Sequence, residues 1–263
     1  MTGRRRTAHN GASIGSGARP WLAALGRRKG GEEMRTRVAP GRKSDRPLLW
    51  AGVLGPLVVT AAVVSESFTH GAVNPWQQSI SLLSEGAAGT LLRLSLVLGG
   101  VLTMLFAWAL HRVWAQAAAL FRSQLAMGIG LVVTGLFIQQ GLAPPGDFRI
   151  PSPWGYLTPV GVVHILGAAV LYLAIVASCW AVARSLPADG RWRRPAWYSG
   201  ATGLAIAVLL PAFVVAAGVG GPSGLLERLA AVLAVAWELW WAGFLLRRGS
   251  PANPSGPMLS QVS

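Results

Sequence analysis

Six long apolar blocks follow one another along the chain, separated by short polar segments. Each block reaches about 17 residues or more, which is the length that an α-helix needs to cross a hydrocarbon core of roughly 30 Å. Open strands would leave backbone groups unpaired in lipid, so the spans must be helices. We therefore predict an all-α integral membrane bundle of six transmembrane helices, over residues 48–64, 90–113, 124–142, 158–182, 196–219 and 224–246.

The composition agrees with a membrane protein. Of the 263 residues, 52% are hydrophobic and only 12% are charged, whereas soluble domains carry about 25% charged residues. The net charge of +14 would also suit a nucleic-acid-binding protein. However, the basic residues gather at the N-terminus and between the apolar blocks, without a recognisable nucleic-acid-binding fold around them. We expect the lipid bilayer as the partner, and no nucleic acid.

Two polar tails flank the membrane domain, which we place at residues 48–248. Residues 1–47 are rich in Gly, Arg and Ser and contain 12 Lys or Arg, and we expect this leader to be disordered, like the tail 249–263. The leader lacks the apolar run of a signal peptide, and an organelle transit peptide is the alternative. The Lys-poor, Arg-rich composition is typical of a GC-rich bacterial sequence. Met34 is a second candidate start, and the topology is the same from either.

Basic residues also predict the orientation. If the N-terminus is cytoplasmic, 20 of the 23 Lys and Arg residues fall on the cytoplasmic side, as the positive-inside rule requires. We therefore expect a multi-pass protein of the cell membrane with both termini in the cytoplasm. Near the inner end of the last span, Trp237, Trp240 and Trp241 fit an interfacial aromatic belt.

The first outer connection, residues 65–89, contains a predicted short helix. Asn74 can cap it, Pro75 suits its first turn and Gly86 can end it. Its apolar side repeats at helical spacing, and a polar stripe runs opposite. We expect this segment to lie in the outer interface or to roof the bundle. Its serines then belong to a site or simply face water; the polar stripe consists of Gln77, Ser81, Ser84 and Glu85.

Polar and ionisable residues gather on the predicted outer face, where three helix N-termini favour an anion. His164 lies near membrane depth, where ionisable residues are functional candidates. The alternatives are that Arg93 and Arg228 pair with Glu85 or Glu227, and that His164 only bridges helices. The candidate cluster, for an anionic lipid headgroup or a protein partner, comprises Ser79, Ser84, Glu85, Arg93, Asp147, His164 and Arg228.

One face of the last span carries two carboxyl groups among small residues. Glu227, Ala231, Ala234 and Glu238 recur at i, i+4, i+7 and i+11, so they share this face and should point toward protein. A carboxylate exposed to lipid at the depth of Glu238 would cost about 2.5–3.5 kcal/mol. Glu238 must therefore be protonated, paired or hydrated, and it is a candidate intramembrane proton site.

No cofactor or metal is expected from the sequence. His70, His164, Asp147 and Glu85 could supply metal ligands, but no HxxxH, HExxH or CxxC spacing connects them. The single cysteine, Cys179, lies within an apolar block and cannot form an intrachain disulfide. We expect it to pack in the interior.

Three stretches carry a family resemblance: NPWQQSISLLSEG, APPGDF followed by TPVGVVH, and GLLERLAAVLAVAWELWW. Together they resemble the DUF998 family of bacterial membrane proteins. The resemblance covers most of residues 48–248. The phenylalanine and proline usual before the family's aspartate appear here as Pro144 and Pro145, so only the proline matches. The family has no assigned activity, so the resemblance implies the architecture alone; its recurring positions correspond to residues 79–84, Asp147, Gly161, His164, Gly224, Arg228 and Trp237.

Three kinds of function remain open. The first is a membrane protein that binds a lipid headgroup or a partner at the outer polar cluster. The second is a lipid-acting hydrolase that uses His164 and a carboxylate as acid and base. The third is a proton-linked carrier of small solutes that uses Glu238. We expect binding rather than catalysis, because it requires only the features described above.

Overall fold

The structure is a computed structural model that describes residues 45–69, 74–87, 89–114, 117–138, 158–186 and 190–249. These residues belong to one compact unit. Residues 45–47 of the predicted leader and residue 249 of the predicted tail are described, and the rest of both lies outside the described residues. Among the described residues, six helices are long and apolar enough to cross a membrane, so the predicted all-α, six-span fold is confirmed. They are α2 (Arg46–Thr69), α3 (Thr90–Val113), α4 (Ala118–Leu136), α5 (Pro159–Ser185), α6 (Gly190–Gly218) and α7 (Ser223–Gly249).

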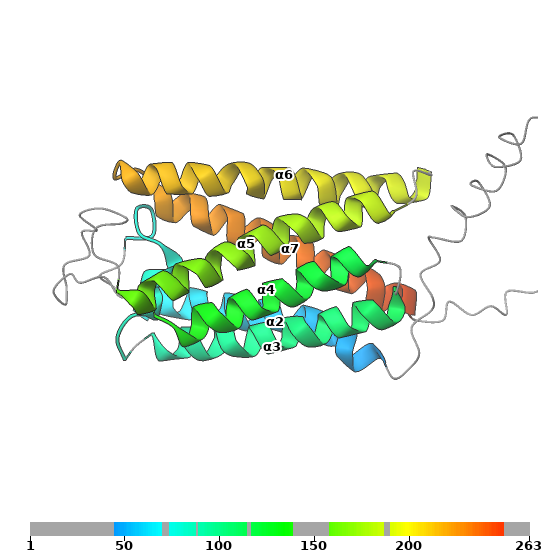
Figure 1. Ribbon diagram of the computed structural model, residues 1–263, viewed down its shortest axis with the longest axis horizontal. Helices are drawn as coiled ribbons and strands as arrows, with labels where there is room; N and C mark the ends of the chain where they lie inside the picture. Colours follow the sequence, from blue (N-terminus) through cyan, green and yellow to red (C-terminus); the bar gives the residue numbers. More distant parts are fainter. Residues whose placement is uncertain are drawn as a thin grey trace, which may run out of the picture. The chain divides into compact units, whose positions relative to one another are not determined.

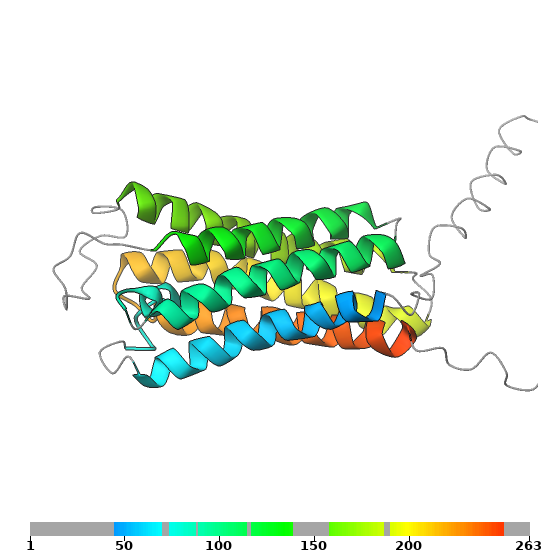
Figure 2. The same cartoon turned by 90° about the horizontal axis from the view of Figure 1, so that it is seen from below.

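The helices lie lengthwise beside one another (Figures 1 and 2), and their contacts close into a ring. Each helix packs against the next one along the chain, and α7 returns to pack against α2. Small residues allow close approach between neighbours, because a side chain at Gly100 of α3 would lie 2.6 Å from the carbonyl oxygen of Gly128 on α4. The ring therefore brings the first and last spans together and encloses a common interior.

The third span differs from its predicted position. It begins at Ala118, earlier than expected, and ends at Leu136 instead of residue 142. Phe137 then adopts an extended conformation, with φ −107° and ψ 120°, and its carbonyl oxygen contacts the imidazole of His164 on α5. Apolar residues continue past Leu136, but the helix ends there. The extended Phe137 places its carbonyl oxygen against His164 of α5.

The segment after α2 differs more strongly from prediction. In place of one helix over residues 75–86, there is a turn followed by a short 3₁₀ helix, η3 (Ile80–Ser84). Ser79 has ψ 148° and breaks the helical path, while its side chain accepts a hydrogen bond from the Ser81 N–H. Gly86 has φ +67° and ends the segment as expected. Since η3 contacts α2, α3 and α7, it roofs one end of the ring.

The tryptophans near the end of α7 pack inside the bundle. Trp237 and Trp241 are 1% and 0% exposed. The Trp237 Nε1 donates to the Ser199 hydroxyl of α6 at 3.0 Å, and the Trp241 ring lies 5.8 Å from that of Trp114, which caps α3. The predicted interfacial belt is therefore wrong for these two residues, because they join α7 to α6 and α3. Trp240 is half-buried and stacks on Phe244.

Candidate functional site

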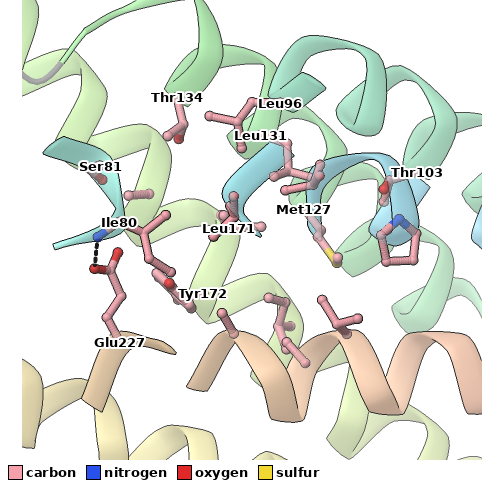
Figure 3. A pocket seen from close by; sticks show the side chains of 18 of the residues that line it. Ile80, Ser81, Leu96, Thr103, Met127, Leu131, Thr134, Leu171, Tyr172 and Glu227 are labelled. Carbon is pink, nitrogen blue, oxygen red and sulfur yellow. Dashed lines mark hydrogen bonds between the residues drawn. The ribbon is translucent and has the colours of Figure 1, made fainter. Parts of the chain in front are cut away.

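A cavity of about 130 Å³ lies inside the bundle (Figure 3). Its wall comes from η3 and from every spanning helix except α6, which gives no residue to the described lining. Most of the lining is apolar, which favours an apolar guest. Apolar lining residues include Val59, Leu96, Met127, Leu131, Leu171 and Val235.

The cavity is long for its volume. Its lining runs from Glu227 to Glu238 on α7 and from His164 to Ile175 on α5. A separation of eleven residues along a helix corresponds to about 16 Å. A volume of about 130 Å³ over that length suits a chain-like molecule better than a bulky ring system.

Polar lining groups gather where the cavity meets η3. His164 is 1% exposed, and its Nδ1 lies 3.1 Å from the carbonyl oxygen of Thr134 and 2.6 Å from that of Phe137. Its Nε2 lies 2.9 Å from the hydroxyl oxygen of Ser81. Carbonyl oxygens only accept hydrogen bonds, so Nδ1 must carry the proton. In the neutral imidazole, Nε2 is then the acceptor of the Ser81 hydroxyl.

Glu227 anchors η3 to α7. Its Oε2 accepts a hydrogen bond from the Ile80 N–H at 2.7 Å (Figure 3), and the hydroxyl groups of Ser79 and Tyr172 also hydrogen-bond this carboxyl. Glu227 is 6% exposed. A buried carboxyl with three donors is well satisfied, so Glu227 acts as a fixed point between η3, α5 and α7.

The start of α7 also holds the turn before η3. The Arg228 Nη1 donates to the carbonyl oxygens of Pro75 at 2.9 Å and Gln78 at 2.8 Å. The Ser223 hydroxyl donates to the Gln77 carbonyl oxygen at 2.7 Å. A Cβ atom at Gly224 would lie 2.3 Å from the Gln78 carbonyl oxygen, so only glycine fits there. This explains the Gly-Leu-Leu-x-Arg sequence at the start of the last span.

The remaining residues of the predicted cluster occupy different surroundings. Arg93 donates through Nη2 to the Thr90 hydroxyl at 2.7 Å and to the Gly86 carbonyl oxygen at 3.3 Å. Ser84 is 0% exposed and donates to the Ser81 carbonyl oxygen at 2.6 Å. Glu85 is half-buried, and burial raises the pKa of its carboxyl. The segment from Asn74 to Thr90 thus contains Ser79, Ser84 and Glu85 and contacts the other described members of the cluster. The charged members do not share one pocket.

Asp147 lies outside the described residues, as does His70. Among the residues that are described, no group of three or more His, Cys, Asp or Glu side chains could hold a metal ion.

Glu238 lies at the far end of the cavity from η3. It is 2% exposed, and its Oε1 has no hydrogen-bond partner among the described residues. Ala231 and Ala234 line the cavity between Glu227 and Glu238, so the predicted small-residue stripe does face the protein interior. Cys179 is 0% exposed and packs in the core, as predicted.

Sequence reasoning missed two members of the site. Ser81 was placed in a polar stripe, but its contact with His164 was not foreseen. Tyr172 gave no signal, because one tyrosine in an apolar span is unremarkable. For Ser81, its place in the polar stripe was the one feature of the sequence that could have marked it as a member of the site. Exposure to water, one of the two alternatives for the serines of this stripe, is wrong for Ser84, which is buried, and Ser81 contacts His164.

Comparisons with known proteins give one match. Residues 53–243 match the family described as protein of unknown function (DUF998). Neither the curated proteins nor the solved structures include a match to the chain. The matched region contains η3, the cavity lining and most of all six spans. The chain therefore belongs to the DUF998 family and is a multi-pass membrane protein with six membrane-spanning helices.

Proposed function

We propose that this protein binds a single-chain lipid inside its ring of helices. The observation that carries the proposal is the cavity, which combines a long apolar wall with polar groups at the η3 end. An apolar cavity of about 150 Å³ holds a benzene-sized guest, so a cavity of about 130 Å³ would enclose a section of one lipid chain and not the whole molecule. The lipid chain would lie along α7 toward Glu238, with its polar part beside Ser81, His164 and Tyr172.

The charge near η3 favours an anionic headgroup. Arg93 and Arg228 both contact the segment that contains η3, and both do so through backbone carbonyl oxygens or a hydroxyl. Each keeps one buried guanidinium nitrogen without a described partner, Nε of Arg93 and Nη2 of Arg228. Cationic side chains near the end of a span are suited to a lipid phosphate or carboxylate. With the orientation predicted from charge, this headgroup would belong to the outer leaflet.

Filling the cavity tests the proposal. Ala168 lines the cavity, whereas the next residue, Ala169, is exposed on the outside of α5. We expect native mass spectrometry of the purified protein to detect a retained lipid. The lipid should be lost in Ala168→Leu and kept in Ala169→Leu, although both variants receive the same side chain.

The melting temperatures of both variants serve as the control for folding. If Ala168→Leu folds and retains the lipid as the unaltered protein does, the lipid is bound elsewhere and the proposal fails. If the unaltered protein retains no lipid and no single-chain lipid raises its melting temperature, the proposal also fails.

A further inference from the structure

We propose that Ser81 is the nucleophile of an acyl-transfer site, with His164 as its general base, and that the substrate is an ester of a single-chain lipid. This inference rests on the proposed lipid binding and adds a reaction to it. The contact between the two side chains carries the argument, because the Ser81 Oγ and the His164 Nε2 lie 2.9 Å apart. That distance lies within the range over which a base takes a proton from a hydroxyl nucleophile.

The neighbours of His164 fix the imidazole in the state that a base requires. Its Nδ1 donates toward the carbonyl oxygens of Thr134 and Phe137, at 3.1 and 2.6 Å. These contacts orient the ring and leave the Nε2 lone pair directed at Ser81. In the Ser-His-Asp arrangement, a third group orients the histidine in the same way. Here two backbone carbonyl oxygens occupy the place of the carboxylate.

The same two carbonyl oxygens would stabilise the positive charge that forms when His164 takes a proton. Both belong to the last turn of α4 or to its cap. The C-terminus of a helix carries a partial negative charge, which favours a cation close to it. The imidazole of His164 therefore has a built-in counter-charge that does not depend on any ionisable side chain.

The backbone of Ser81 is held in place by the serines on either side. The Ser81 N–H donates to the Ser79 hydroxyl at 3.1 Å, and the Ser84 hydroxyl donates to the Ser81 carbonyl oxygen at 2.6 Å. Glu227 holds the intervening Ile80 N–H. Ser79 and Ser84 are thus positioning residues for Ser81, which is itself half-buried and lines the cavity.

The reaction follows from this geometry. The Ser81 Oγ adds to the ester carbonyl carbon while the His164 Nε2 takes the hydroxyl proton. The bond from that carbon to the alcohol oxygen then breaks, and the alcohol leaves with the proton from His164. Water repeats the sequence on the acyl-serine, which releases the carboxylic acid and restores Ser81. A section of the acyl chain occupies the cavity, and the alcohol part lies toward η3.

A long-chain alkyl fluorophosphonate tests the inference on the full-length protein in lipid nanodiscs. We expect covalent labelling at Ser81, identified by peptide mass, and hydrolysis of a p-nitrophenyl ester of a fatty acid. Ser81→Ala should abolish both. His164→Gln should slow labelling by at least about 100-fold, the lower limit for general base catalysis. Ser67→Ala, at an exposed serine of α2, should leave both unchanged.

The outcomes separate this inference from the proposed lipid binding. If the protein retains a lipid but Ser81 is not labelled, or if labelling occurs at another residue, the acyl-transfer inference is overturned and lipid binding stands. If His164→Gln does not fold, labelling of Ser81 and ester hydrolysis by the unaltered protein decide the matter. If neither lipid retention nor labelling occurs, both proposals fall.

Discussion

The Nε2 atom of His164 lies 2.9 Å from the Oγ atom of Ser81, although 83 residues separate them in the sequence. The contact joins α5 to η3 and lies in the wall of the cavity. It depends on two further elements, because α4 orients the imidazole and α7 holds η3 in position. The consequences of this arrangement can be measured one residue at a time.

The close contact at Gly224 predicts a strong effect of one methyl group. In Gly224→Ala, the added Cβ would meet the Gln78 carbonyl oxygen at 2.3 Å, so the turn before η3 must move. Gly243→Ala is the matched control on the same helix, since no atom of a described residue is found within 4 Å of a Cβ there. We expect a lower melting temperature and faster proteolysis near Trp76 in the first variant only. Equal melting temperatures and equal proteolysis of the two variants would contradict the close contact between α7 and the turn.

The two carboxyl groups of α7 should respond in opposite directions to the same substitution. Glu227→Leu leaves the Ile80 N–H and two hydroxyl groups without their acceptor, at about 1–3 kcal/mol for each buried unsatisfied group. Glu238→Leu removes a buried oxygen, Oε1, that has no partner in the described part of the chain, so it should raise the free energy of unfolding. Thermal unfolding in detergent measures both.

A loss of stability in Glu238→Leu would mean that Glu238 is paired in the membrane and would contradict this reading. The proton-linked carrier remains a separate prediction from the sequence. It requires transport of a solute that is lost in Glu238→Gln.

The pH dependence of stability should contain a small contribution from Glu85. Burial raises the pKa of this carboxyl above its usual value of 4.5. An acid with a raised pKa in the folded state stabilises the fold at low pH, and that contribution is lost as the pH rises through the raised pKa. The melting temperature relative to Glu85→Gln should therefore fall as the pH increases above about 4.5. If the melting temperature relative to Glu85→Gln stays constant or rises with pH, this prediction is contradicted.

The orientation predicted from charge can be tested with one cysteine. Cys179 is the single cysteine of the chain and is buried, so it gives little background. Asn74 is exposed in the turn before η3. We expect Asn74→Cys to react with a membrane-impermeant maleimide added outside intact cells. An engineered cysteine at Arg247, which is exposed near the end of α7, should react only after lysis. The reverse pattern would invert the topology.

The fold was largely predictable, because long apolar segments in lipid have few alternatives to helices. The stripe from Glu227 to Glu238 was predictable too, since helical spacing alone places these residues on one face. The helix expected over residues 75–86 was not formed, because hydrogen bonds from Arg228 and to Ser79 favour a turn and η3. The Arg228 contact comes from a helix about 150 residues away and leaves no local signal, whereas the Ser79 contact is local.

The candidate site was predictable only in part. His164 was identified because an ionisable residue within a span is costly. Its partner Ser81 became evident only when the ring of helices placed η3 above α5. Trp237 and Trp241 were misplaced for the same reason, because amino-acid type alone cannot distinguish a lipid-facing aromatic residue from one buried by a neighbouring helix.

The contact of α7 with α2 also constrains how the protein is assembled. The ribosome makes α2 first and α7 last, so in a nascent chain with five spans the ring is open between α6 and α2. Glu227, Arg228 and Glu238 all arrive with the final helix. The hydrogen bonds that hold η3 and the turn before it can therefore form only when synthesis is nearly complete. A chain terminated before residue 223 lacks the helix that closes the ring.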